Sequence, residues 1–229
     1  MLYDESMKSP TFDIERSLSS SYRNIVGVDE AGRGPLAGPV VAAAVRYRRH
    51  SFEIPDSERE AFRYIRDSKT LSERLREGSF ARILEYFDVA TGVVDAESID
   101  RVNILQATFL AMREAVGKLF GDGVGEDTLV LVDGNQKIPS VRFSQQTVVK
   151  GDAISFSVAA ASIVAKVTRD RILSAIDRDY PHFGFSRHKG YGTAAHMEAI
   201  RRYGILPIHR RSFAPIRRAL GTFAKKKES

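Results

Sequence analysis

The chain has 229 residues, of which 43% are hydrophobic and 28% charged, enough apolar sequence to bury the core of one large domain or two small ones. The absence of cysteine excludes a disulfide framework, a thiol nucleophile, an iron–sulfur cluster and a cysteine-built zinc site. The net charge of +6 arises from 35 Lys and Arg, 25 of them Arg, against 29 Asp and Glu, and an excess of arginine favours a nucleic-acid partner.

The first predicted elements are a loose N-terminal arm and two strands. Residues 1–22 are polar and serine-rich, without the basic-then-apolar order of a secretory signal. Residues 24–29 (NIVGVD) and 39–47 (PVVAAAVRY) are apolar runs typical of strands, and a glycine-rich bend joins them. Because the longest apolar runs, 39–45 and 158–165, are far too short to span a bilayer, we expect a cytoplasmic protein without a membrane partner.

Further along the chain, strand-like and helix-like patterns alternate. Thr70 to Glu73 fits a capping box that opens a helix running to about Tyr86. Apolar residues recur at helical spacing from Asn103 to Phe120, which indicates an amphipathic helix. The other predicted elements are strands over 88–94, 128–132 and 143–149, a long helix over 153–177, and loops and short helices beyond it. This order predicts an α/β fold in which a mixed sheet is followed by a helical C-terminal portion.

Four acidic side chains fall at predicted strand ends or at the start of the long helix. Asp29 and Glu30 close the first strand, Asp133 closes the strand TLVLVD, and Asp152 precedes the long helix. Because ligands bind at the strand ends of an open α/β sheet, we expect these carboxylates to converge there. Converging carboxylates repel one another unless cations neutralise them, and oxygen ligands without cysteine suit Mg²⁺ or Mn²⁺. The pattern predicts a divalent metal site.

Each acid also has a structural alternative. Asp133 and Gly134 form a common turn dipeptide, and Asp152 could cap the helix behind it. Asp29 and Glu30 are adjacent, and neighbours in a strand point to opposite faces of the sheet. Both can serve one site if the pleat breaks at Glu30, which the following Ala-Gly pair makes plausible.

A glycine-rich motif offers a different function. Residues 32–37 (GRGPLA) match the G-x-G-x-x-A form of the dinucleotide-binding fingerprint. Asp29 and Glu30 directly before it would repel a pyrophosphate, and Pro35 removes a backbone donor. The following PVVAAAV prefers a strand, so no helix N-terminus is offered to the phosphates. These features disfavour a nucleotide cofactor.

The basic excess gathers late in the chain. It comprises Arg201, Arg202, Arg210, Arg211, Arg217, Arg218 and Lys225 to Lys227. Such a cluster predicts contacts to phosphates, with Arg201, Arg202, Arg210 and Arg211 as the candidates. A solvated face followed by a basic tail is the alternative.

Longer sequence blocks follow one another along the chain. The opening block is GVDEAGRGPLAGPVVAAAV, and the others follow in order as DSKTLS, ILQATFLAM, LVDGN, VVKGD, AAASIVAKVTRDR, HKGYG and HRRSFAP. Together these blocks resemble the type 2 ribonucleases H, the ribonuclease HII family. The resemblance covers roughly residues 24–216 and leaves out the N-terminal arm and the KKKES tail. It implies a ribonuclease H-like mixed β-sheet flanked by helices, with a helical C-terminal extension. The implied organisation is a polar N-terminal arm (1–22), a catalytic domain (23–180), a substrate-contacting helical region (181–220) and a basic tail (221–229).

The resemblance also implies roles for individual residues. The family's four active-site acids map onto Asp29, Glu30, Asp133 and Asp152. Its Gly-Arg-Gly element, which contacts the ribose 2′-hydroxyl, maps onto Gly32, Arg33 and Gly34, and its junction-sensing tyrosine maps onto Tyr191. Where relatives often have KGYP, this chain has Gly192. Asp170 is the other acid that could fill the fourth position, but its place inside the helix indicates a salt-bridged surface residue. Predicted contacts to the substrate backbone are Lys69, Lys150, Lys166 and Lys189, each with a solvated role as the alternative.

The implied activity is that of an endonuclease. It would cut the RNA strand of RNA–DNA hybrids and single ribonucleotides embedded in duplex DNA, with two divalent ions, Mn²⁺ or Mg²⁺, held by the four acids. The products would carry a 5′-phosphate and a 3′-hydroxyl, and we expect a monomer. Two alternatives remain: another metal-dependent nuclease of the same fold, or a non-catalytic basic nucleic-acid-binding module.

Overall fold

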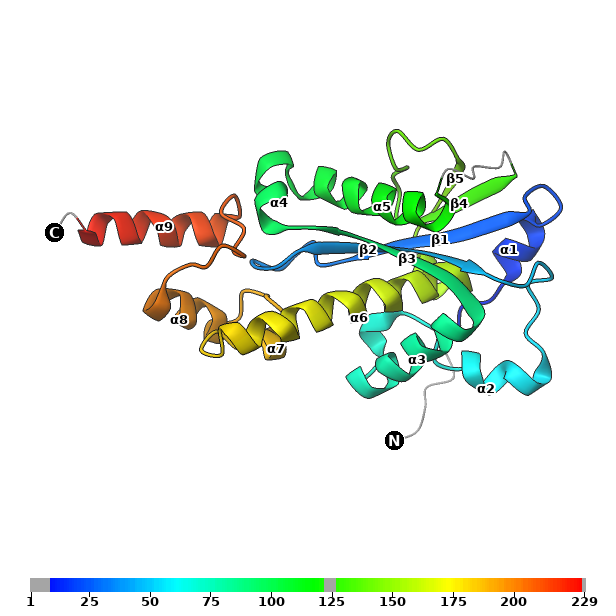
Figure 1. The fold of residues 1–229 in the computed structure, drawn as a ribbon, viewed down its shortest axis with the longest axis horizontal. Helices are drawn as coiled ribbons and strands as arrows, with labels where there is room; N and C mark the ends of the chain where they lie inside the picture. The colour runs from blue at the N-terminus through cyan, green and yellow to red at the C-terminus, as the bar shows by residue number, and fades with distance from the viewer. Residues whose placement is uncertain (1–8, 122–126, 228–229) are drawn as a thin grey trace.

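The computed structural model describes residues 9–121 and 127–227, and its centre is a five-stranded mixed sheet. The strands are β1 (Asn24–Ala31), β2 (Val40–Tyr47), β3 (Phe87–Val94), β4 (Thr128–Asp133) and β5 (Ser144–Val148). Their order across the sheet is β3-β2-β1-β4-β5 (Figure 1). Strand β2 pairs antiparallel with both β1 and β3, whereas β4 pairs parallel with β1 and β5 pairs parallel with β4. All five strands expected from the apolar runs are present.

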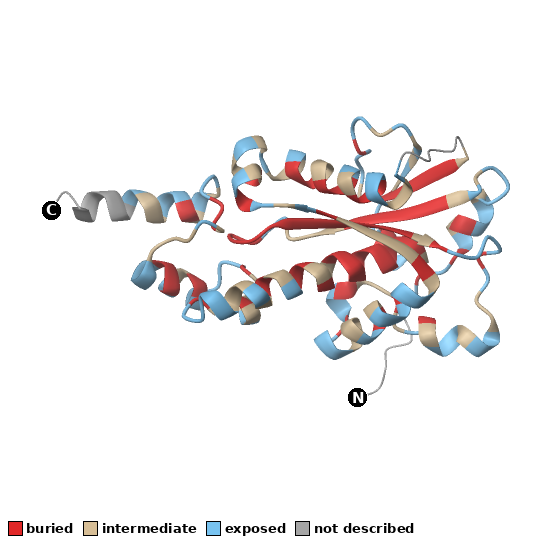
Figure 2. Ribbon diagram, in the orientation of Figure 1, coloured by how far each residue is buried: buried red, intermediate tan, exposed pale blue. Residues whose placement is uncertain are grey.

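Helices cover both faces of this sheet. In chain order they are α1 (Asp13–Leu18), α2 (Arg59–Phe62), α3 (Glu73–Tyr86), α4 (Ala96–Val102), α5 (Ile104–Phe120), α6 (Phe156–Asp179), α7 (Phe185–His188), α8 (Ala194–Tyr203) and α9 (Ala214–Lys227). Figure 1 shows α4 and α5 above the sheet and α6 and α3 below it. Buried residues line the sheet and the inner sides of these helices (Figure 2). The chain thus forms the expected mixed β-sheet flanked by helices.

The central strand β1 is buried on both faces, which explains its nearly continuous apolar sequence. Val26 and Val28 face the core shared with α5, whereas Ile25 faces the core shared with α6. Gly27 lets α6 approach the strand, since a Cβ there would lie 2.1 Å from the backbone carbon of Ser157. The long helix α6 therefore lies close against β1 and can present its own side chains to the end of that strand.

The register of the parallel pair decides where the acids lie. Val28 of β1 pairs with Val132 of β4. The next residue of each strand is an aspartate, Asp29 in one and Asp133 in the other. Because parallel strands bring the same ends to one edge of a sheet, the two carboxylates meet at that edge.

The N-terminal arm differs from the loose segment expected. Residues 9–22 pack against the body of the protein, and Phe12 and Glu15 are buried. Glu15 Oε1 accepts hydrogen bonds from Ser155 Oγ at 2.6 Å and from the amide of Ser157 at 3.0 Å, at the start of α6. A contact between residues 140 positions apart leaves no local signal in a polar sequence, which is why the expectation was wrong.

Two further expectations about helices also need correction. The cap of α3 is Ser72, whose Oγ accepts from the amide of Leu75, and the expected capping residue Thr70 lies in a short 3₁₀ turn before it. The helix α4 had not been expected, because its seven residues are too few for a periodic pattern. Neither difference moves the strands that carry the acids.

The C-terminal portion is helical, as expected, and has its own small core. Helices α7 and α8 pack around buried residues that include Leu173 and Phe185. Helix α9 extends away from the body of the molecule at the left of Figure 1. It runs from Ala214 to Lys227, so the structure draws no boundary at the expected start of a tail, residue 221. Within the described residues, no helix is both long enough and apolar enough to cross a membrane.

Candidate active site

The four predicted acids come together at one edge of the sheet. Asp29 and Glu30 belong to β1, and Asp133 ends the neighbouring strand β4. Asp152 lies in a short 3₁₀ turn, Gly151–Ala153, whose Gly151 amide donates to Asp133 Oδ1 at 2.7 Å. This hydrogen bond attaches the turn, and with it Asp152, to the end of β4. The alternative of Asp152 as a helix cap is wrong, because Ser155 Oγ caps α6.

The pleat of β1 does not break at Glu30, contrary to the expectation. Pairing with β2 continues in register through Asp29, Glu30 and Ala31. Asp29 is buried and lies near the Ser162 hydroxyl of α6, whereas Glu30 lines a small cavity beside α5 together with Arg33 and Asp133. The two acids therefore lie on opposite faces of the strand. Both remain close to Asp133, since each feels its charge.

Burial and mutual repulsion make these carboxylates reluctant to ionise. Burial, and then the charges of Glu30 and Asp133, raise the pKa of Asp29 well above its ordinary value. Burial also raises the pKa of Glu30, although Arg33 opposes this with an ion pair at 3.3 Å. Burial and the neighbouring aspartates raise the pKa of Asp152 as well. A cation placed among these groups would relieve the repulsion and favour their charged forms.

The protein supplies one positive charge to this cluster itself. Burial alone would lower the pKa of Lys69, but the charges of Asp152, Asp29, Asp67 and Asp133 outweigh it, so the pKa is raised. Lys69 therefore lies among these acids, while its predicted contact with the substrate backbone stays a prediction. A lysine this close to several carboxylates can also reach a phosphate held between them.

Sequence reasoning missed the residues that fix Lys69 in place. Asp67 Oδ1 accepts from the Lys69 amide at 2.9 Å, which forms the turn before α3. The Ser68 hydroxyl hydrogen-bonds the Ser162 hydroxyl of α6 at 3.0 Å. In the DSKTLS block, the lysine is predicted as a substrate contact and the threonine as a helix cap, but Asp67 and Ser68 carry no prediction. A serine followed two residues later by a threonine gives no signal for a contact with a helix 94 residues further on.

The chemistry of the acids fits a hard divalent cation. Every candidate ligand is a carboxylate oxygen, and burial together with the neighbouring carboxylates raises the pKa values of Asp29, Glu30 and Asp152. Among residues 9–121 and 127–227, no three or more His, Cys, Asp or Glu side chains form a ready-made cage for one ion. Such an open arrangement suits Mg²⁺, which is usually held by one or two carboxylates, with water and substrate phosphate as the other ligands.

The glycine-rich loop and Tyr191 lie together beside the acids. Arg33 is half-exposed, and its ion pair with Glu30 places the loop at the rim of the acid cluster. A Cβ added to Gly34 would lie 3.5 Å from Cε1 of Tyr191, so the tyrosine ring flanks the loop. Tyr191 is 50% exposed, which leaves its ring free to contact a ligand. The structure therefore brings Gly32, Arg33, Gly34 and Tyr191 to one surface.

Two of the other predicted lysines have partners within the protein. Lys166 Nζ donates to Asp170 Oδ1 at 2.6 Å, one turn further along α6. Asp170 is salt-bridged, as expected, but is buried and not on the surface. Lys189 Nζ lies 3.7 Å from Glu73, with little of its side chain exposed. Lys150 is an exposed residue in a left-handed conformation, directly before the turn that carries Asp152.

The basic cluster of the C-terminal region does not form a single surface. Arg210 is completely buried and donates only to backbone carbonyls, so it does not meet a phosphate as expected. Arg201 and Arg202 are exposed but lie against Glu198. Arg211 remains exposed. The count of arginines in a sequence segment says nothing about which of them the fold will bury.

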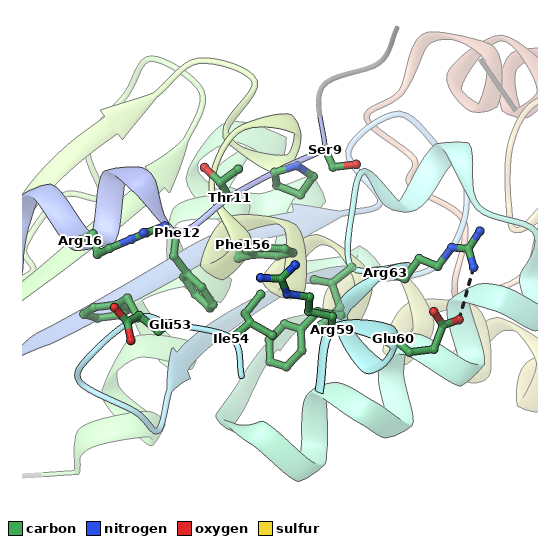
Figure 3. Close-up of a pocket in the computed structure, with 14 residues that line it drawn as sticks. Ser9, Thr11, Phe12, Arg16, Glu53, Ile54, Arg59, Glu60, Arg63 and Phe156 are labelled. Carbon is green, nitrogen blue, oxygen red and sulfur yellow. Dashed lines mark hydrogen bonds and ion pairs between the residues drawn. The ribbon is translucent and has the colours of Figure 1, made fainter. Parts of the chain in front are cut away.

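A further cavity lies away from these acids. It has a volume of about 820 Å³ and lies between the N-terminal arm and the segment 52–65. Figure 3 shows Phe12 and Phe156 in it, with Arg59, Arg63 and Glu60 at its rim and an ion pair between the last two. No predicted site residue lines it, so the candidate site is the open edge of the sheet.

Comparison with known proteins gives a consistent match. A family model described as Ribonuclease HII matches residues 26–216. The ribonuclease HII of Fusobacterium nucleatum is 46% identical over 229 residues, which cover 99% of each chain. That of Endomicrobium trichonymphae is 47% identical over 92% of this chain and 95% of its own. Both relatives match almost from end to end.

Solved structures agree with the fold. The ribonuclease H2 of Pyrococcus horikoshii is 28% identical, with a TM-score of 0.62 over 88% of this chain and 99% of its own. A Bst ribonuclease HIII in complex with Mn²⁺ has a TM-score of 0.66 over 97% of this chain and 77% of its own. At 19% identity, the second comparison supports the fold alone.

Proposed function

This chain belongs to the ribonuclease HII family and is a ribonuclease H, and on that premise we propose how it acts. We propose that it hydrolyses the RNA strand of RNA–DNA hybrids and also cuts on the 5′ side of single ribonucleotides embedded in duplex DNA. The products carry a 5′-phosphate and a 3′-hydroxyl. This proposal assigns catalysis to Asp29, Glu30, Asp133 and Asp152.

One observation carries the proposal. Four carboxylates, two of them buried (Asp29 and Asp152) and three with raised pKa, lie at an open sheet edge directly beside a glycine loop and an exposed tyrosine. Acids of this kind weaken a fold unless they serve a cation or a reaction. A basic binding module without catalysis has no use for them.

The acids are proposed to hold Mn²⁺ or Mg²⁺, with two ions during the reaction. When bound, such ions activate the attacking water and stabilise the leaving oxygen. Asp29 lies between Glu30 and Asp133 in the charge cluster and is the proposed shared ligand. Asp152 reaches the same place because Gly151 is hydrogen-bonded to Asp133. Lys69 is proposed to orient the scissile phosphate, because it already lies among these acids.

Recognition of a ribonucleotide is proposed to depend on the glycine loop and Tyr191. The 2′-hydroxyl is the group that distinguishes ribose from deoxyribose, and it both donates and accepts hydrogen bonds. Gly32 and Gly34 lack a Cβ, so their backbone can approach the sugar closely. Arg33 can bind the adjacent phosphate, and the exposed ring of Tyr191 can stack at the junction.

We also propose that the protein acts as a monomer. Because hybrids and ribonucleotide-containing duplexes occur where a genome is copied, we propose a cytoplasmic enzyme. An archaeal ribonuclease HII from Archaeoglobus fulgidus has been solved in complex with PCNA, but at 23% identity that structure informs the fold alone.

The proposal can be tested on three labelled duplexes: a long RNA–DNA hybrid, a DNA duplex with one ribonucleotide, and an all-DNA duplex. Purified protein should cut the first two with Mn²⁺ or Mg²⁺, should cut none in EDTA, and should leave the third intact. Binding to all three without cutting would favour the binding module. Cutting of the all-DNA duplex would favour another nuclease of the same fold.

A further inference from the structure

Two arginines are buried without a carboxylate partner behind the substrate-facing loop. Arg169 of α6 is 1% exposed and Arg210, which follows α8, is 0% exposed. Burying a charge is costly unless it is well hydrogen-bonded. Burial lowers the pKa of Arg169 to about 10, and burial with the charge of Arg169 lowers that of Arg210 to about 9, so both stay charged at neutral pH. Neither forms an ion pair within the part of the chain that the structure describes.

The hydrogen bonds of Arg169 join two separate segments. Its Nε donates to the carbonyl of Pro39 at 2.9 Å, and one terminal nitrogen donates to the carbonyl of Ala37 at 3.0 Å. The other terminal nitrogen donates to the carbonyl of Lys189 at 2.9 Å. The first two carbonyls end the glycine loop, and the third lies two residues before Tyr191. One planar guanidinium therefore connects the loop to the turn that carries Tyr191.

Arg210 holds the start and the end of the same loop. Its Nε and one terminal nitrogen donate to the carbonyl of Gly38 at 3.0 and 2.9 Å. The terminal nitrogens also donate to the carbonyls of Gly32 at 2.6 Å and Arg33 at 3.0 Å. These two carbonyls belong to the element proposed to meet the ribose. The conformation of that element is therefore tied directly to Arg210.

Close packing leaves little freedom between these parts. The amide of Leu36 donates to the carbonyl of Gly190 at 2.8 Å, a direct bond from the loop to the turn. A Cβ on Gly32 would lie 2.2 Å from Nε of Arg169. A Cβ on Gly190, which has a φ of +82°, would lie 2.4 Å from the carbonyl oxygen of Ala37. Movement of either guanidinium would thus displace both the loop and the turn.

We propose that Arg169 and Arg210 are specificity-determining positioning residues, which hold the Gly32–Arg33–Gly34 element and Tyr191 at the spacing needed to read a single ribonucleotide. This inference rests on the proposed function and extends it to residues that do not touch the substrate. Lysine cannot replace either residue, because an ammonium on a flexible stem cannot reproduce the planar set of donors that meets several carbonyls at once.

Recognition of a junction between deoxyribonucleotide and ribonucleotide is the step most sensitive to the spacing between the Gly32–Arg33–Gly34 element and Tyr191. A single embedded ribonucleotide offers one 2′-hydroxyl and one junction, so the loop and Tyr191 must fit it together. A long hybrid offers many ribonucleotides and needs no junction. A displacement of about 1 Å can cost roughly a hundredfold in rate. We therefore expect damage to the arginines to fall mainly on the single-ribonucleotide substrate.

The test compares Arg169→Lys and Arg210→Lys with a matched control, Arg82→Lys. Arg82 is exposed on α3 and pairs with Glu85, away from the loop. For each protein, kcat and KM are measured on the single-ribonucleotide duplex and on the long hybrid, and thermal unfolding is recorded. We expect kcat/KM on the single ribonucleotide to fall roughly tenfold to a hundredfold more than on the hybrid. The control should match the wild type on both substrates.

A second variant approaches the same contact without changing an arginine. Gly190→Ala should push the turn away from Ala37 and should produce the same selective loss of kcat/KM on the single-ribonucleotide duplex. If a lysine variant fails to fold, the result for Gly190→Ala is the one that tests the inference. Equal losses on both substrates, or no loss on either, would overturn the inference and leave the proposed function intact. A wild-type protein that cuts neither substrate would instead overturn the proposed function, and this inference with it.

Discussion

Replacement of Asp29 by asparagine changes the charge at the centre of the acid cluster with little change in shape. Asp29 Oδ1 accepts one hydrogen bond, from the amide of Glu30 at 2.7 Å, and asparagine can keep this bond through its own Oδ1. The carboxylate itself is disfavoured, because burial and then Glu30 and Asp133 raise its pKa. Asp29→Asn should therefore fold, bind duplex and, in EDTA, unfold at a temperature no lower than that of the wild type.

The same change should abolish cleavage. At about 4 Å and an effective dielectric constant of about 20, one unit of charge contributes about 4 kcal/mol to its interaction with another. A barrier raised by that amount slows the reaction about a thousandfold, since each 1.36 kcal/mol is worth a factor of ten. We thus expect kcat to fall by about three orders of magnitude at saturating Mn²⁺ or Mg²⁺.

The assay combines single-turnover cleavage of a single-ribonucleotide duplex with thermal unfolding in EDTA and in excess Mn²⁺. The wild type should gain stability from Mn²⁺, and Asp29→Asn should gain less. Asp13→Asn, at an exposed position on α1, is a matched control that should behave as the wild type does. Retention of more than about a tenth of wild-type turnover would refute the assignment of Asp29.

Three further changes follow from the same structure. Tyr191→Ala should lower kcat/KM on the single-ribonucleotide duplex about five- to 150-fold, which corresponds to a stacking contact of roughly 1–3 kcal/mol. Tyr191→Phe should retain most of the wild-type kcat/KM. Equal losses on a long hybrid, with lowered thermal stability, would show a role in the fold. Arg33→Ala should reduce the slope of log affinity against log salt by about one unit, whereas the control Arg16→Ala on α1 should leave the slope unchanged. An unchanged slope for Arg33→Ala would show that Arg33 does not contact a phosphate. Burial lowers the pKa of His196 and His209 to about 4, so their contribution to stability is complete above pH 6.5 and is lost as the pH falls toward 4. Between neutral pH and pH 5, the free energy of unfolding measured in urea should fall by about 2 kcal/mol more for the wild type than for His209→Gln. Equal losses in the two proteins would contradict this.

The strands and the long helices could be predicted because their signals are local. The runs 25–28 and 129–132 within two of these strands are apolar throughout, since both of their faces are covered by helices. The acids could be predicted for the same reason, because each follows an apolar run or opens a helix. The pairing of Val28 with Val132 then places Asp29 beside Asp133. Here the sequence pattern and the topology agree.

The supports of the site could not be predicted, because they join distant segments. Glu15 reaches the start of α6, and Arg210 reaches carbonyls of a loop more than 170 positions earlier. An arginine count predicts charge but not burial, so Arg210 was expected on the surface. Its partners are backbone carbonyls, which every residue has and no sequence pattern reveals. The buried pair Arg169 and Arg210 could be found only from the folded chain.

We propose above that the acids at this sheet edge direct water against the phosphate next to a ribonucleotide. The most direct measurement is the position and chemistry of the ends produced from a duplex with one ribonucleotide in the presence of Mn²⁺ or Mg²⁺. We expect a cut on the 5′ side of the ribonucleotide, with a 3′-hydroxyl on the upstream fragment and a 5′-phosphate on the ribonucleotide. A cut on its 3′ side that leaves a 2′,3′-cyclic phosphate would contradict it, because the ribose hydroxyl and not water would then have attacked.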